Sequence, residues 1–144
     1  MMTRTLQLDQ VTFEIFADLE YRDEKGTLVA YAPNTDFANL RLSVTSIFKK
    51  GVEVFEVAER EIPELAKNGG GTCDVVGDKF VFRTKEASSE DPESTIFFWY
   101  VGLGGHIAVL SVFVDHRSAE DPRAKHVLAC AELLVQSFRR IQSA

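Results

Sequence analysis

Residues 96–114 read IFFWYVGLGGHIAVLSVFV, and this run contains no Asp, Glu, Lys or Arg. Its length approaches that of a helix that spans a bilayer. Gly102, Gly104 and Gly105 lie at its centre, however, where each glycine costs a helix about 1 kcal/mol relative to alanine. The two halves are rich in aromatic and β-branched residues, which favour strands, and no positive charge immediately flanks the run. The sequence therefore predicts a β-hairpin and not a membrane span.

A two-residue turn at Gly104-Gly105 would set the register of this hairpin, with Leu103 opposite His106 and Trp99 opposite Leu110. One face would carry Phe97, Trp99, Val101, Leu103, His106, Ala108, Leu110, Val112 and Val114, and the other Ile96, Phe98, Tyr100, Ile107, Val109, Ser111 and Phe113. Because both faces are apolar, both need cover. Two alternatives remain: the chain's own helices cover both faces, or one face stays partly open for a partner's hydrophobic segment or a second copy of the chain.

Alternating apolar residues predict four further strand segments. These are residues 11–21, 27–32 after a turn at 23–26, 40–45, and the hairpin 73–84. The first three segments have one apolar and one polar face, which is typical of an antiparallel sheet with one face toward water.

Two helices are predicted from helical spacing of apolar residues. The first begins after Gly51, and Pro63 predicts a kink or an early end, before the glycines at 69–71 stop it. The second runs over 121–141 with Asp121 as its cap. The expected fold is a single α+β domain, residues 1–144, with a central antiparallel sheet of about six to seven strands between two helices.

The composition is that of an ordinary globular domain, with 45% hydrophobic and 26% charged residues and a formal net charge of −6. The acidic balance argues against nucleic acid, since phosphate contacts need clustered Lys and Arg. The N-terminal residues lack the apolar core of a signal peptide, so we expect a cytoplasmic protein with no membrane insertion. Cys73 and Cys130 are expected to be reduced.

Motifs for a cofactor or a reaction are incomplete. GLGGHI, residues 102–107, lacks the third glycine of a dinucleotide loop, and NGGGTC, residues 68–73, lacks the lysine of a phosphate loop. We therefore expect no cofactor and no metal. The alternative is a small hydrolase or metal-dependent enzyme that uses Asp115 and His116, with His126 as a further candidate, if these side chains meet in a pocket.

The double-sided apolarity of the hairpin favours a binding module over an enzyme. The predicted partner-binding residues are Trp99, Tyr100, Leu103 and His106 on or near the hairpin, with Glu90 and Asp91 in the loop before it as a secondary rim. The partner would be another protein of unknown identity, or a second copy in a homodimer.

Two stretches, GTLVAYAPNTDFANLRLSV at 26–44 and IAVLSVFVDHRSAEDPRAKHVLACAELLVQSFRRI at 107–141, together with the order of the elements, resemble the superfamily of PsbP and the Ran-binding Mog proteins. This resemblance implies a noncatalytic scaffold that binds other proteins. Bacterial cytoplasmic proteins of similar size include EagR-type chaperones, which bind hydrophobic segments of type VI secretion effectors. A second implied role is that of an immunity protein that binds a toxin domain.

Overall fold

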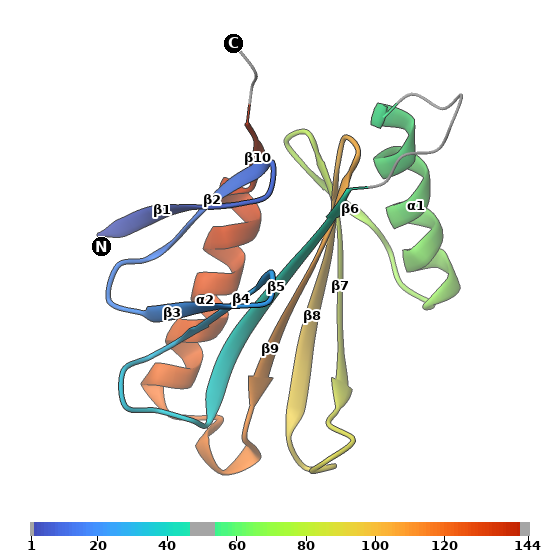
Figure 1. Ribbon diagram of the computed structural model, residues 1–144. Coiled ribbons are helices and arrows are strands. Elements are labelled where there is room, and N and C mark those ends of the chain that lie inside the picture. The colour runs from blue at the N-terminus through green and yellow to red at the C-terminus, as the bar shows by residue number, and fades with distance from the viewer. Residues whose placement is uncertain (1, 47–53, 142–144) are drawn as a thin grey trace.

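The computed structural model describes residues 2–46 and 54–141, which fold into two antiparallel sheets and two α-helices (Figure 1). Their order is β1 (Thr3–Leu8), β2 (Val11–Phe16), β3 (Glu20–Glu24), β4 (Thr27–Tyr31), β5 (Ala38–Ser46), α1 (Val54–Asn68), β6 (Asp74–Val76), β7 (Lys79–Ala87), β8 (Thr95–Leu103), β9 (His106–Val114), the short 3-10 helix η1 (His116–Ser118), α2 (Pro122–Ser137) and β10 (Arg139–Arg140). The predicted α+β class, with a central sheet between two helices, is confirmed.

The β8–β9 hairpin forms with the predicted register at the centre of a seven-stranded sheet of order β3-β4-β5-β9-β8-β7-β6. Leu103 pairs with His106 and Trp99 with Leu110. Gly104 has a φ of 59°, a left-handed conformation that suits glycine at the first position of a tight hairpin turn. Because alternate residues of a strand point to opposite faces, this register also confirms the predicted division of the hairpin into two apolar faces.

One face of the large sheet is sealed by α2 and by the small sheet β1-β2-β10 (Figure 1). Val127, Ala131 and Leu134 of α2 are at most 1% exposed and pack in one cluster with the residues of β8 and β9 on this side. We call it the covered face. The remaining fully buried large side chains of β2 and β5, including Phe13, Ile15, Leu40 and Leu42, belong to the same cluster.

The small sheet differs from the prediction of one continuous strand over 11–21. The chain turns after Phe16, so β2 pairs with β1 and β10, whereas β3 forms the outer edge of the large sheet. Alternation indicates which side of a strand is apolar but not which strand it pairs with. In this segment the alternation of β2 continues across the turn to the buried Leu19, so the turn could not be recognised. The strand β1 was not predicted, because its side chains are mostly exposed.

The helix α1 packs on the opposite face, mainly against β7 and β8. It continues past Pro63 to Asn68, so the predicted early end is wrong. The expected glycine stop is confirmed: Gly70 has a φ of 74°, and the amide of Gly71 donates to the carbonyl of Ala66. The predicted start of this helix lies outside the described residues.

The helix α2 begins as predicted but ends earlier than residue 141. Asp121 accepts a hydrogen bond from the amide of Arg123, and Pro122 occupies the first turn. At the other end the chain turns extended at Phe138 and enters β10. The ammonium of the buried Lys79 donates to the carbonyls of Gln136 and Phe138 at 2.8 and 3.1 Å, which satisfies carbonyls that the helix leaves open.

Polar contacts also tie α2 to the covered face. The guanidinium of Arg83 on β7 donates to both carboxylate oxygens of Glu132, at 2.9 and 3.0 Å, and the indole of Trp99 donates to the same carboxylate at 2.8 Å. These hydrogen bonds lower the pKa of Glu132, and the contact with Arg83 has the largest effect. Burial acts in the opposite direction but is the weaker influence. Within the described ranges, no helix has the length and apolarity needed to cross a membrane.

The turn at Gly104 gives a first test of the hairpin. Gly104→Ala is expected to lower the free energy of unfolding by about 1–3 kcal/mol, because a side chain is strained at a positive φ. Gly105→Ala is the matched control, since the φ of Gly105 is not positive. Urea unfolding of both variants measures the difference, and equal losses would contradict the assignment of the strain to Gly104.

The Glu132 contacts predict a pH-dependent stability. Because the folded state lowers the pKa of this carboxyl, its contribution is present above its ordinary pKa of 4.5 and is lost as the pH falls through the folded value. The difference in unfolding free energy between wild type and Glu132→Gln should therefore be larger at pH 7 than at about pH 3. Glu120→Gln, which removes a carboxylate that is 91% exposed, should change little at either pH. A Glu132 effect that stays constant with pH would contradict the role of its charge.

Candidate functional site

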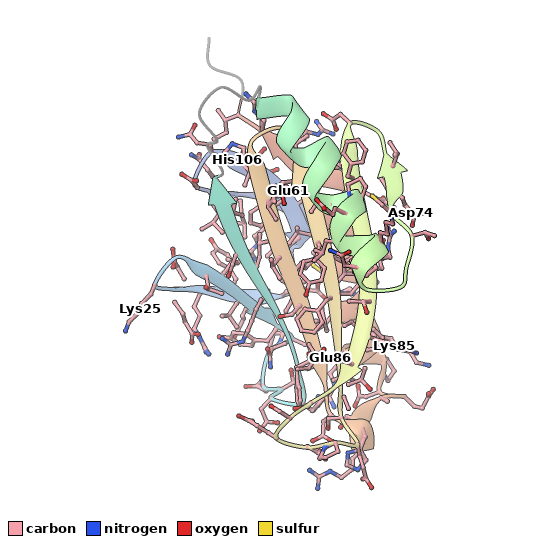
Figure 2. All side chains as sticks on the ribbon, turned by 90° about the vertical axis from the view of Figure 1, so that its right-hand side faces the viewer. Lys25, Glu61, Asp74, Lys85, Glu86 and His106 are labelled. Carbon is pink, nitrogen blue, oxygen red and sulfur yellow. The ribbon has the colours of Figure 1, made fainter. Side chains whose placement is uncertain are left out.

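The second face of the large sheet is only partly covered. Tyr100 and Ile107 lie against the part of α1 that contains Ile62 and Ala66. Figure 2 shows α1 in front of one end of β7 and β8, with no helix in front of the other end of these strands. Residues of β8 and β9 that belong to this face are half-buried, and we call the following five the open strip: Ile96, Phe98, Val109, Ser111 and Phe113.

Strand pairing places a polar border on each side of the open strip. On β7, Thr84 lies opposite Phe98 and Glu86 opposite Ile96, and both β7 side chains are exposed. On the other side, β5 places Asn39, Arg41 and Ser43 opposite Phe113, Ser111 and Val109. The strip is therefore an apolar surface about two strands wide, bounded by polar residues.

Charged residues of the outer strands continue the β5 border. The carboxylate of Glu24 on β3 forms an ion pair with Arg22 at 2.7 Å. It also lies 3.5 Å from the guanidinium of Arg41. All three side chains are at least 40% exposed, so these pairs add little stability. They leave Arg41 accessible beside the strip and Arg22 accessible on the outer strand β3.

The four hairpin residues predicted to bind a partner lie on different faces. Tyr100 is half-buried beside the open strip, with its ring stacked 6.0 Å from that of Phe98. Trp99, Leu103 and His106 are 5%, 5% and 9% exposed and lie on the covered face. Burial lowers the pKa of His106, which favours its neutral form.

The predicted secondary rim lies in the loop between β7 and β8. Glu90 is exposed, and its amide donates to the hydroxyl of Ser88. Asp91 accepts from the hydroxyl of Ser94 at 2.7 Å, and this contact is the main cause that lowers its pKa. Ser94 is fully buried, so the loop is held by its own polar groups.

Of the proposed enzymatic residues, Asp115 and His116 lie together, with Asp115 Oδ1 3.7 Å from His116 Nδ1, whereas His126 pairs with a different carboxylate. His116 has Nδ1 3.3 Å from Asp91 and Nε2 2.8 Å from Glu93, whereas His126 has Nε2 3.0 Å from Asp18. Asp115 caps η1 through the amide of Arg117 and pairs with the guanidinium of that residue. The imidazole of His126 also stacks on Phe16, with ring centroids 4.5 Å apart.

The cysteines do not supply an activated nucleophile. Both are free thiols, and Cys130, on α2, is fully buried. Burial raises the pKa of Cys130 to about 11 and also raises that of Cys73. Since the thiolate is the reactive form, both thiols are weak nucleophiles at neutral pH.

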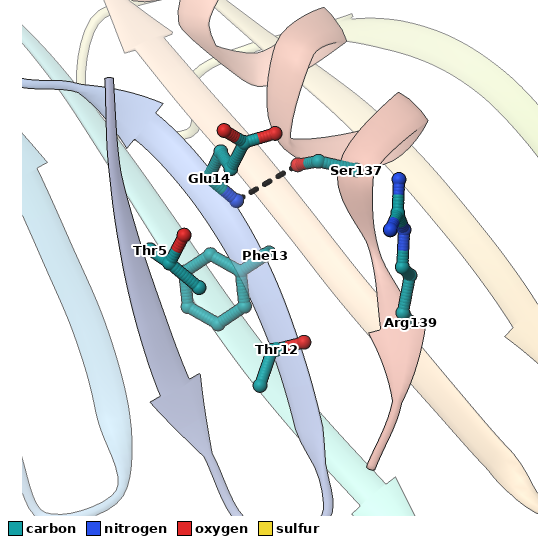
Figure 3. Close-up of a pocket in the computed structure, with 6 residues that line it drawn as sticks. All are labelled: Thr5, Thr12, Phe13, Glu14, Ser137 and Arg139. Carbon is teal, nitrogen blue, oxygen red and sulfur yellow. Dashed lines mark hydrogen bonds between the residues drawn. The ribbon is translucent and has the colours of Figure 1, made fainter. Parts of the chain in front are cut away.

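A shallow pocket of about 240 Å³ lies where β1 and β2 meet the end of α2 (Figure 3). It is lined by Thr5, Thr12, Phe13, Glu14, Ser137 and Arg139. The hydroxyl of Ser137 accepts from the amide of Glu14 at 2.8 Å and donates to the carbonyl of Leu133 at 2.8 Å. This hydroxyl therefore joins α2 to β2, and no histidine or cysteine among the lining residues could activate it as a nucleophile.

The open strip and Glu93 were not among the predicted site residues. The signal for the strip was present, because alternation assigned these residues to one apolar face. What the sequence lacked was the position of α1, which decides how much of that face remains accessible. No pattern in the sequence indicated Glu93 as a site residue, because its contact with His116 joins segments that are distant in the chain.

No protein-family model matches the chain. No curated protein sequence matches it either. Among solved structures, a crystal structure of a protein from Bacteroides thetaiotaomicron VPI-5482 is similar, with a TM-score of 0.66, 18% sequence identity and 93% of this chain covered. This chain spans 46% of the length of that protein. The solution structure of cyanobacterial PsbP (CyanoP) from Synechocystis sp. PCC 6803 aligns over 96% of this chain and 91% of its own, with 13% identity and a TM-score of 0.42. The first of these likenesses shows that the α+β fold of this chain also occurs in another protein.

Proposed function

We propose that this protein is a noncatalytic binding module that receives an apolar segment of another protein on the open strip. The observation that carries the proposal is the partial cover of a hairpin that is apolar on both faces. The covered face is sealed, whereas Ile96, Phe98, Val109 and Phe113 on the other face are half-buried with polar residues on both sides. Apolar surface that is grouped in this way typically marks an interaction site.

The segment that suits this surface best is an amphipathic helix. The face already packs one helix, since α1 lies on β7 and β8 through Ile62 and Ala66. A helix is roughly 10 Å wide and strands are spaced by about 4.8 Å, so a second helix beside α1 would span roughly two strands. The open strip has about this width. Arg41 and Glu86 at its borders would contact the polar flanks of such a helix.

Addition of a strand to a sheet edge is less favoured. The edge strand β6 has only three residues, and the opposite edge strand β3 reads EYRDE. Short and charged edges are typical of sheets that resist further pairing. We therefore assign recognition to the face of the sheet and not to its edges.

Binding of an apolar helix is compatible with the chaperone or adaptor role that the resemblance to EagR-type proteins implies. A cytoplasmic location and a secretion-related partner are parts of this proposal. The role of an immunity protein is supported only by the acidic composition. We therefore prefer the chaperone or adaptor role.

The first experiment identifies what lies on the open strip in the native cell. A photo-crosslinking amino acid replaces Ser111, at the centre of the strip, and the crosslinked peptides are sequenced by mass spectrometry. We expect peptides from one partner with apolar residues at helical spacing. Crosslinks to a second copy of this chain, together with a dimer in light scattering, would contradict the proposal in favour of a homodimer.

The second experiment measures binding of the identified peptide by fluorescence polarisation. The double variant Phe98→Gln/Phe113→Gln should weaken binding by at least about tenfold, because it replaces two apolar contacts. Val75→Gln is the matched control, since Val75 is 66% exposed on β6, away from the strip. Circular dichroism checks that both variants fold. Equal affinity of wild type and the folded double variant would contradict the assignment of binding to the open strip.

A further inference from the structure

Two loops at the same end of the large sheet bring a histidine together with two carboxylates. Asp91 and Glu93 lie between β7 and β8, and His116 follows β9 (Figure 1). One ligand atom from each of these three side chains lies within 4.8 Å of the other two. The three residues are separated in the chain, and the antiparallel pairing of β8 with β9 brings them together.

Two of the three residues are held in place by a buried serine. The hydroxyl of Ser94 donates to Asp91 Oδ2 at 2.7 Å and accepts from the amide of His116 at 3.2 Å. Ser94 is fully buried, and both contacts are partly shielded from solvent. Asp91 and His116 are therefore positioned together, while Glu93, whose side chain is 74% exposed, is free to adjust. Fixed ligands of this kind reduce the entropy lost on binding.

We propose that Asp91, Glu93 and His116 bind one divalent transition-metal ion, with zinc as the expected ion. Imidazole nitrogen and carboxylate oxygen are ordinary ligands of zinc, at about 2.0–2.2 Å, whereas calcium and magnesium prefer oxygen alone. Around a metal at this distance, ligand atoms lie roughly 3–4 Å apart. In the structure the three ligand atoms lie within 4.8 Å of one another, and Asp91 and Glu93 face different nitrogens of His116, so metal binding requires rotation of these side chains toward one nitrogen.

The surrounding charges are compatible with this assignment. Nδ1 of His116 lies 3.3 Å from Asp91 Oδ2 and 3.7 Å from Asp115 Oδ1, and Nε2 lies 2.8 Å from Glu93 Oε2. A carboxylate that accepts from the second nitrogen is a common support of metal-binding histidines. The nearby cation, Arg117, pairs with Asp115 at 3.2 Å.

The site is independent of the open strip and of the proposed binding function. It involves His116 of the sequence-based enzymatic alternative, but it uses Asp91 and Glu93 in place of Asp115 and His126. Bound metal would join the β7–β8 loop to the segment after β9. These segments adjoin the end of the strip that contains Ile96 and Phe113.

Calorimetric titration of zinc chloride into tag-free protein near neutral pH tests the proposal. We expect one equivalent of zinc to bind, and His116→Ala and Glu93→Gln each to weaken binding by at least about tenfold. His126→Ala is the matched control, because His126 also pairs with a carboxylate, Asp18, but among the described residues it belongs to no group of three potential metal ligands. It should leave the affinity unchanged. Circular dichroism confirms that each variant folds.

Cobalt substitution separates this site from binding at the cysteines. Cobalt held by Asp91, Glu93 and His116 gives no thiolate charge-transfer band, whereas cobalt at Cys73 does. Three outcomes would overturn the proposal: no zinc binding at millimolar concentration, equal affinity of wild type and folded His116→Ala, or a thiolate band that accompanies the bound equivalent.

Discussion

The structure depends on one constraint, which is that the β8–β9 hairpin is apolar on both faces. If these two strands lay at the edge of a sheet, or had one face in water, they would expose a large apolar area. Their position at the centre of the seven-stranded sheet gives both strands hydrogen-bonded neighbours, β7 on one side and β5 on the other. Each face must then be covered from above or below, and the two helices do so unequally.

The two faces of the hairpin are covered unequally because the two helices make different contacts with the sheet. The helix α2 packs together with the small sheet, and Lys79, Arg83 and Trp99 add hydrogen bonds to its carbonyls or to Glu132. The described part of α1 contacts the sheet through a smaller apolar cluster that contains Ile62, Ala66 and Phe82. The first helix therefore covers one end of β7 and β8, and the open strip is the part of the same face that lies beyond it.

The ends of the same hairpin also generate the second feature of the surface. Since β8 and β9 are antiparallel, the loop before β8 and the segment after β9 meet at one end of the sheet. Ser94 connects them through hydrogen bonds to Asp91 and to the amide of His116. A single element of the fold thus determines both the apolar surface proposed to bind a partner and the polar cluster proposed to bind a metal.

The sequence by itself determined the hairpin, its turn at Gly104-Gly105, its register and its two apolar faces, because these depend on local turn chemistry and on the period of two in a strand. It also indicated both helices and the glycine stop after Asn68. Tertiary structure alone decided that the alternation over 11–21 is divided between two sheets, since strand pairing is not encoded in alternation. It also decided that Trp99 faces α2 while Phe98 faces the open strip, because only the packing of the helices distinguishes two equally apolar faces. The contact of Glu93 with His116 arises from the meeting of two loops, which no pattern along the chain reports.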